Sequence, residues 1–189
     1  MISQGFYFLF LGLLGVERGV ELAISRRNAR AASQAGAFEV GQGQYRVMAA
    51  MHALFFASCA AEVGLLDRPF PGAIGFVALG LVVVAQALRY AAVLALGKMW
   101  NVRIIVWPLA PPVTRGLYRF VRHPNYVAVA IEVACVPLVH GAFLTAVVFS
   151  IANAAVLTVR IREEERALGA SYAEAFRDRP RMIPRLFGG

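Results

Sequence analysis

Residues 124–159 read PNYVAVAIEVACVPLVHGAFLTAVVFSIANAAVLTV, two apolar segments that meet at PLVHG (137–141). The hydrocarbon core of a bilayer is about 30 Å thick and takes roughly 20 mainly apolar residues as a helix. The first segment, 124–138, holds a single charged residue, and the second, 142–159, holds none. Because their connection is so short, the two segments are predicted to form a tight antiparallel helical hairpin in a membrane.

Three more apolar segments precede this hairpin, at about 2–24, 47–66 and 70–96. The whole chain of 189 residues is 59% hydrophobic and only 16% charged, whereas a soluble domain carries about 25% charged residues. This composition excludes disorder, collagen-like repeats and a disulfide scaffold. The sequence therefore predicts an all-α integral membrane protein with about five transmembrane helices. Residues 31–44, AASQAGAFEVGQGQ, are predicted to be a connecting loop.

The charge distribution predicts how the chain lies in the membrane. Lys and Arg number 19 against 11 Asp and Glu, a net charge of +8. Long apolar segments are not expected in a nucleic-acid-binding protein. We therefore interpret the positive charge as a signal of how the chain is oriented in the membrane. Basic residues gather after the first span, between the third and fourth spans, and in the tail. The positive-inside rule then predicts an outside N-terminus and a cytoplasmic tail and site, in the cytoplasmic membrane if the source is bacterial.

The segment TRGLYRFVRHPNY (114–126) leads into the hairpin. Proline suits the first turn of a helix, so Pro124 is predicted to begin the fourth span. A helix start leaves free N–H groups with a partial positive field, here beside Arg122 and His123. This arrangement suits an anionic group such as a carboxylate. The alternative is that these basic residues only anchor the chain at the membrane surface.

A second polar stretch follows the last apolar segment. One face of the predicted fifth helix carries Asn153, Leu157, Arg160 and Glu164. Arg160 and Glu164 are one turn apart, a spacing that allows an ion pair. The run Glu163–Glu165 is unusual because this side of the membrane is otherwise basic. Together the two stretches predict a site for a zwitterion, with its carboxylate at the start of the fourth helix and its ammonium at Glu164 or Glu165.

Ionisable residues within apolar segments are candidate site residues, because a charge in lipid is costly. Glu132 lies two turns into the fourth span and is predicted either to pair or to lie in a substrate pocket, for which Asn153 is a second candidate. Other charged residues are predicted to pair locally (Glu17, Arg18 and Glu21) or to reach a membrane surface (Glu62 and Arg89). Cys59 and Cys135 are predicted to be buried free thiols, His52 a packed histidine, and no metal site is predicted.

The pattern GLYRFVRHPNY (116–126) followed by RIREEERALGASY (160–172) resembles the isoprenylcysteine carboxyl methyltransferase family. The tail RPRMIP (179–184) matches the closing pattern of that family, and the resemblance covers about residues 93–187. The motifs ERGVEL and LGKMWNVRIIV, nearer the N-terminus, are similar to a bacterial branch that is often linked to type III polyketide synthases and methylates alkylpyrones or alkylresorcinols.

The resemblance implies one membrane domain, with spans at 1–92 and a cofactor-binding core at 93–189. It implies that S-adenosylmethionine binds between the cytoplasmic end of the last two spans and a cytoplasmic C-terminal helix. The residues implied to bind this cofactor are Tyr118, Arg122, His123, Pro124, Tyr126, Glu164, Glu165, Tyr172 and Arg181. Arg160 and Glu164 are implied to lie near the reacting centre. A third carboxylate, Glu163, leaves open which of the three takes the cofactor's ammonium.

These features predict an O-methyltransferase that acts on a carboxyl or hydroxyl group of a lipophilic acceptor, isoprenylcysteine-like or alkylpyrone-like, which enters from the bilayer lipids. A carboxylate needs no base, whereas a phenol or enol would use Glu132 or Glu164. One alternative is an NADPH-dependent membrane reductase, whose phosphates would bind Arg115, Arg119 and Arg122. The other is a non-enzymatic membrane component. Neither nucleic acid nor metal is predicted as a partner.

Overall fold

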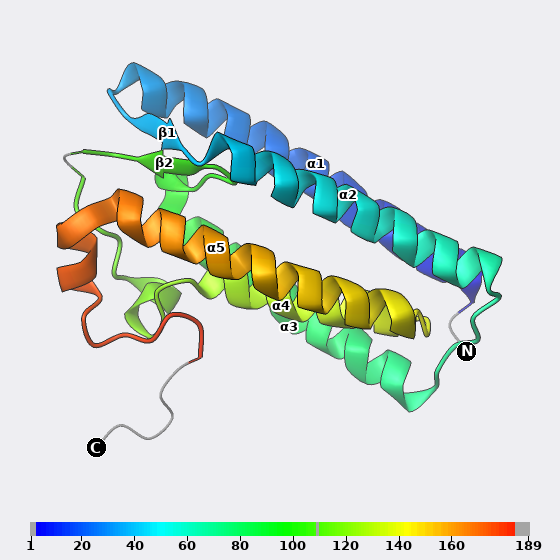
Figure 1. Ribbon diagram of the computed structural model, residues 1–189. Helices are drawn as coiled ribbons and strands as arrows, with labels where there is room; N and C mark the ends of the chain where they lie inside the picture. The colour runs from blue at the N-terminus through cyan, green and yellow to red at the C-terminus, as the bar shows by residue number, and fades with distance from the viewer. Residues whose placement is uncertain (1–2, 109, 184–189) are drawn as a thin grey trace.

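A computed structural model describes residues 3–108 and 110–183 of the chain. The all-α prediction is confirmed, because five α-helices account for most of the described residues (Figure 1). These are α1 (Gln4–Gln34), α2 (Gln42–Leu65), α3 (Ala73–Leu96), α4 (Pro124–Leu138) and α5 (Phe143–Ala175). The minor elements are the strands β1 (Phe38–Val40) and β2 (Ile104–Val106) and the 3₁₀ turns η1 (Gly97–Met99) and η2 (Gly116–Arg119).

The helices run along one common direction in two groups (Figure 1). α1 packs beside α2, while α4 packs between α3 and α5, and α2 touches α5 across the groups. Among the described residues, three helices (α2, α3 and α5) are long and apolar enough to cross a membrane. α4 is apolar but shorter, and α1 carries charged residues within its length. The chain is therefore built as an integral membrane protein.

The predicted loop at 31–44 was wrong. α1 continues to Gln34 and ends in a Schellman motif, in which Gly36 adopts φ +81° and Ala37 N–H donates to the Ala32 carbonyl at 3.0 Å. The next residues form β1, which pairs antiparallel with β2, Phe38 opposite Val106. The partner strand comes from a segment more than 60 residues away, so local composition gave no signal for it.

The predicted hairpin of the last two helices is confirmed, with α4 ending at Leu138 and α5 beginning at Phe143. Glu62, which was expected to reach the membrane surface, instead caps the start of α5. Its carboxylate accepts hydrogen bonds from the backbone N–H groups of Leu144 (3.1 Å) and Thr145 (2.7 Å) and pairs with Arg68 at 3.0 Å. The free N–H groups of a helix start attract a carboxylate that lies close enough to bind them.

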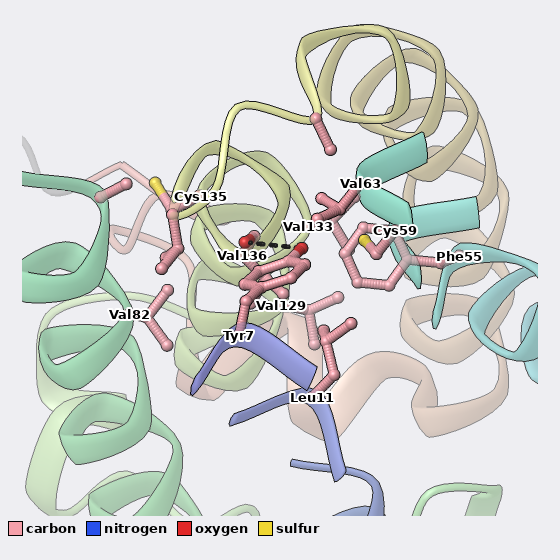
Figure 2. Close-up of a cluster of buried hydrophobic side chains, with 13 residues drawn as sticks. Tyr7, Leu11, Phe55, Cys59, Val63, Val82, Val129, Val133, Cys135 and Val136 are labelled. Atoms are coloured by element: carbon pink, nitrogen blue, oxygen red, sulfur yellow. Dashed lines mark hydrogen bonds between the residues drawn. The ribbon is translucent and has the colours of Figure 1, made fainter. Parts of the chain in front are cut away.

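The apolar core lies in the half of the bundle that includes the α4–α5 turn. Figure 2 shows Tyr7 of α1 pointing into a layer of valines from α4, with its hydroxyl donating to the Val136 carbonyl at 3.2 Å. Both cysteines, Cys59 and Cys135, are buried and free, as predicted. This packed half fixes the helices against one another and leaves the other half of the bundle for a cavity.

Gly75 of α3 packs closely against Phe70 and the α4–α5 turn. A Cβ atom at this position would lie 2.4 Å from the Phe70 ring and 2.8 Å from the backbone oxygen of Val139. We expect Gly75→Ala to lower the free energy of unfolding by about 1–3 kcal/mol, because backbone cannot move aside as a flexible side chain can. SDS titration of the protein in mixed micelles measures this change.

Gly80 on the same helix is the matched control, because nothing lies within 4 Å of a Cβ added there. Gly80→Ala is expected to leave the stability unchanged or to raise it by about 0.5–1 kcal/mol, as alanine is the better helix former. Equal losses of stability in the two variants would contradict the close approach at Gly75.

Candidate active site

A cavity of about 470 Å³ lies between the α1–α2 pair and the α4–α5 hairpin. Part of α3 and the segments around η1, β2 and η2 complete its wall. The predicted site residues that line it are Tyr118, Arg122, His123, Tyr126, Arg160, Glu164 and Tyr172. The predicted site residues that do not line it are Pro124, Glu132, Asn153, Glu165 and Arg181.

The three consecutive glutamates point in different directions, because successive residues on a helix are about 100° apart. Glu164 lines the cavity. Glu163 lies toward the turn before α2, where a Cβ on Gly41 would meet its Oε2 at 2.9 Å. Glu165 lies against the start of α4 and the tail, where Arg181 donates to it at 2.7 Å. Of the three carboxylates, Glu164 is therefore the one that a ligand in the cavity meets.

Glu165 does not line the cavity and is held by basic groups around the start of α4. His123 Nε2 donates to it at 3.2 Å, and the Arg122 guanidinium lies 3.5 Å away. The hydrogen bonds from Arg181 to Glu165 also raise the pKa of that exposed guanidinium. The two side chains expected to bind a ligand's carboxylate thus already hold a carboxylate of the chain.

The start of α4 at Pro124 agrees with the prediction. However, the backbone N–H groups of Arg122 and His123 donate to the tail carbonyls of Pro180 and Arg181, both at 2.9 Å. These two N–H groups are therefore not available to an anion. The tail closes this side of the site, which the sequence could not show because the pairing joins residues almost 60 positions apart.

Arg160 and Glu164, whose spacing allows an ion pair, do not pair directly and are linked through Tyr126. The Tyr126 hydroxyl accepts a hydrogen bond from Arg160 Nε at 2.8 Å and donates one to Glu164 Oε2. Arg160 Nη2 also donates to the backbone carbonyl of Val102 at 2.7 Å. This leaves Arg160 Nη1 as a buried donor that lacks an acceptor among the described residues.

Aromatic side chains form the wall near the tail. Tyr118, Tyr172 and Phe176 pack in one cluster, and the Tyr172 hydroxyl donates to the Arg122 carbonyl at 3.4 Å. Burial raises the pKa of Tyr118, so this phenol stays neutral at any physiological pH. The His123 ring stacks on that of Tyr126, with 5.2 Å between ring centres. The wall offers flat apolar surfaces of the kind that a heterocyclic base stacks on.

The two candidate pocket residues lie elsewhere. Glu132 is paired with Arg89, whose Nε donates to it at 3.0 Å, so the pairing alternative holds and Arg89 does not reach the membrane surface. Asn153 is buried and does not line the cavity. The sequence instead missed the contribution of α1 and α2 to the cavity, notably Glu21 and His52. The charged residues inside the first apolar segment were the feature of the sequence that could have indicated this contribution.

Residues 78–170 match the isoprenylcysteine carboxyl methyltransferase (ICMT) family. The chain is also 40% identical over 163 residues to uncharacterized protein YpbQ of Bacillus subtilis, which covers 86% of this chain and 96% of that protein. It is 28% identical over 152 residues to an uncharacterized protein of Haemophilus influenzae, which covers 80% of this chain and 88% of that protein. The family match includes the start of α4 and the three glutamates.

Proposed function

Because the chain belongs to the isoprenylcysteine carboxyl methyltransferase family, we propose that it transfers a methyl group from S-adenosylmethionine to a carboxyl or hydroxyl group of a lipophilic acceptor. Family membership implies methyltransferase activity in general. The identity of the cofactor and the O-methylation are our proposal. We also propose that the end of the bundle near Glu164 lies at the cytoplasmic face of the membrane.

The observation that carries the proposal is the arrangement of Glu164, Tyr126 and Arg160 in the wall of the cavity. Glu164 is a carboxylate facing the cavity and suits the ammonium of an amino-acid moiety. Two further residues of the cavity wall, Asn125 and Trp107, also have a buried polar atom (Oδ1 and Nε1) without a partner among the described residues. Buried polar groups are normally satisfied, so these atoms fit a polar cofactor beside Glu164.

S-adenosylmethionine, when bound, supplies an electrophilic methyl group on a sulfonium. The residues of the chain position the reactants. Tyr126 and the Val102 carbonyl hold Arg160 in place, so that its free Nη1 can orient the acceptor's oxygen. Such orientation is worth roughly 7–11 kcal/mol of a bimolecular barrier. A carboxylate acceptor is already ionised and needs no group to take a proton.

The remaining cavity wall suits a hydrocarbon chain. Apolar side chains from four helices face it, including Leu22, Phe56, Val129 and Leu157. A pocket of this size and lining buries most of a small amphiphile. The acceptor would enter from the lipid and place its polar end near Glu164. The link to polyketide synthases stays a prediction.

Calorimetric titration of the purified protein with S-adenosylmethionine and with NADPH tests the proposal. We expect micromolar binding of S-adenosylmethionine, with competition by its demethylated product. Binding of NADPH alone would overturn the proposal in favour of the reductase, which would have to place its phosphates beside Glu164. Binding of neither compound would favour a non-enzymatic role.

A further inference from the structure

A second group of charged side chains lies deeper in the bundle, and three of its members, Arg18, Glu21 and Arg89, line the cavity. We call Glu17, Arg18, Glu21, Arg89 and Glu132 the inner charged cluster. Its salt bridges join α1, α3 and α4, with Arg18 to Glu21 at 2.8 Å and Arg89 to Glu21 at 3.8 Å. Glu132 follows His123 by nine residues, or roughly 13 Å along the axis of α4. The cluster is therefore well separated from the start of α4.

The carboxylate oxygens of this cluster are satisfied with one exception. Both oxygens of Glu17 accept hydrogen bonds, from Tyr90 and Gln86, and both oxygens of Glu132 accept from Arg89. Glu21 Oε2 is paired with Arg18. Glu21 Oε1 is buried and has no partner among the described residues, in a residue that is only 8% exposed and lines the cavity.

The charges in the cluster do not balance, because three carboxylates face two guanidinium groups. An uncompensated carboxylate in an apolar medium needs a donor, since its desolvation is otherwise unopposed. The neighbouring donors are already used: Arg89 is bonded to Glu132, and Arg18 is bonded to Glu17 and Glu21.

His52 lines the same cavity and also a smaller hollow that it shares with Arg18 and Glu132, so it adds a second acceptor near the inner charged cluster. Its Nδ1 lies 2.9 Å from the Met48 carbonyl. A carbonyl only accepts, so Nδ1 carries the proton, and Nε2 of the neutral ring is an acceptor. Both side chains thus carry an acceptor atom with no donor among the described residues, which calls for a ligand that donates.

We propose that Glu21 and His52 form a subsite for a hydrogen-bond-donating group of the acceptor, a hydroxyl or an ammonium. This group is additional to the group that is methylated. The subsite rests on the proposed function in that the cavity is taken to hold the acceptor. The subsite narrows the acceptor to an amphiphile whose hydrocarbon chain carries a hydrogen-bond donor. An unsubstituted hydrocarbon chain, or a chain with a ketone at that carbon, is expected to bind less tightly.

Three fatty acids that differ at a single carbon test the subsite: 12-hydroxyoctadecanoic, 12-oxooctadecanoic and octadecanoic acid. The chain's two tryptophans, Trp100 and Trp107, both line the cavity, so their fluorescence reports binding to the protein in lipid nanodiscs. The hydroxy acid is expected to bind at least about 10-fold more tightly than the oxo acid, because the ketone cannot donate to Glu21. This comparison needs no variant.

The substitution Glu21→Gln sharpens the test. Arg18 only donates, so the amide oxygen turns toward it and the NH₂ group takes the position of Oε1. The preference for the hydroxy over the oxo acid is then expected to fall to within about 3-fold or to reverse, since a donor has replaced the acceptor. Glu17→Gln is the matched control, with the same loss of charge on the same helix but no contact with the cavity, and it keeps the preference.

Equal affinities for the hydroxy and oxo acids, no binding of the hydroxy acid, or an unchanged preference in Glu21→Gln would each overturn the subsite. Calorimetry with S-adenosylmethionine on the same preparation separates this result from the proposed function. Cofactor binding without a hydroxyl preference contradicts the subsite alone. A hydroxyl preference without cofactor binding supports the subsite and contradicts the methyltransferase proposal.

Discussion

Glu164→Gln is expected to weaken the binding of S-adenosylmethionine about 100-fold, roughly 2.7 kcal/mol. The substitution keeps the size of the side chain and replaces the carboxylate, which faces the cavity, with an uncharged amide. An ammonium that loses its only carboxylate in a partly dry site also loses much of its compensation for desolvation. Calorimetry of the purified variant measures the change directly, without any knowledge of the acceptor.

The neighbouring glutamate provides the control for this experiment. Glu163 lies toward Gly41 and does not line the cavity, so Glu163→Gln is expected to leave the affinity for S-adenosylmethionine within about 2-fold of wild type. Both variants lose one negative charge on the same turn of α5, and a general electrostatic effect would weaken both alike. An equal loss in the two, or full affinity in Glu164→Gln, would remove Glu164 from the cofactor site.

Much of the end of the cavity near Glu164 could be predicted from the sequence, because Tyr126, Arg160 and Glu164 lie on two regular helices joined by a short turn. Pro124 marks the start of α4, and the spacing of Arg160 and Glu164 places both on one side of α5, as found. The link between them was not predictable, since Tyr126 belongs to another helix and its hydroxyl bonds to both depend on how α4 and α5 pack.

Contacts between distant segments account for the remaining differences. Glu62 was expected at the membrane surface but caps α5, and Glu165 was a candidate for a ligand's ammonium but is bound by Arg181 of the tail. Both partners lie more than ten positions away in the sequence. Periodicity describes one helix at a time and gives no information on which helix ends meet. For the same reason, the roles of Glu21 and His52 in the cavity became visible only with the fold.

The largest loss of stability is expected from breaking the Arg89–Glu132 pair. Arg89 is 5% exposed, and its Nε donates to Glu132 at 3.0 Å between α3 and α4. Removing one partner of a buried ion pair leaves an uncompensated charge, which costs about 3–5 kcal/mol. Unfolding of Arg89→Met and Glu132→Leu by SDS titration in mixed micelles measures the two losses.

The two single variants are expected to differ, because the inner charged cluster has an excess of carboxylate. Arg89→Met leaves three carboxylates with one guanidinium, so its loss of stability is expected at the upper end of the range of about 3–5 kcal/mol. Glu132→Leu leaves two of each, and Arg89, already 3.8 Å from Glu21, can then turn to it, so this loss belongs at the lower end. The double variant keeps the wild-type net charge of the cluster and is expected to recover most of the stability.

Losses that simply add in the double variant would show that Arg89 and Glu132 are not coupled. The same variants also bear on the proposed subsite. In Glu132→Leu, Arg89 is free to donate to Glu21, which satisfies the carboxylate oxygen that otherwise accepts from the ligand. The preference for the hydroxy over the oxo fatty acid should therefore fall in this variant although neither Glu21 nor His52 has changed. A preference that persists would mean that the excess carboxylate is not what selects a donor.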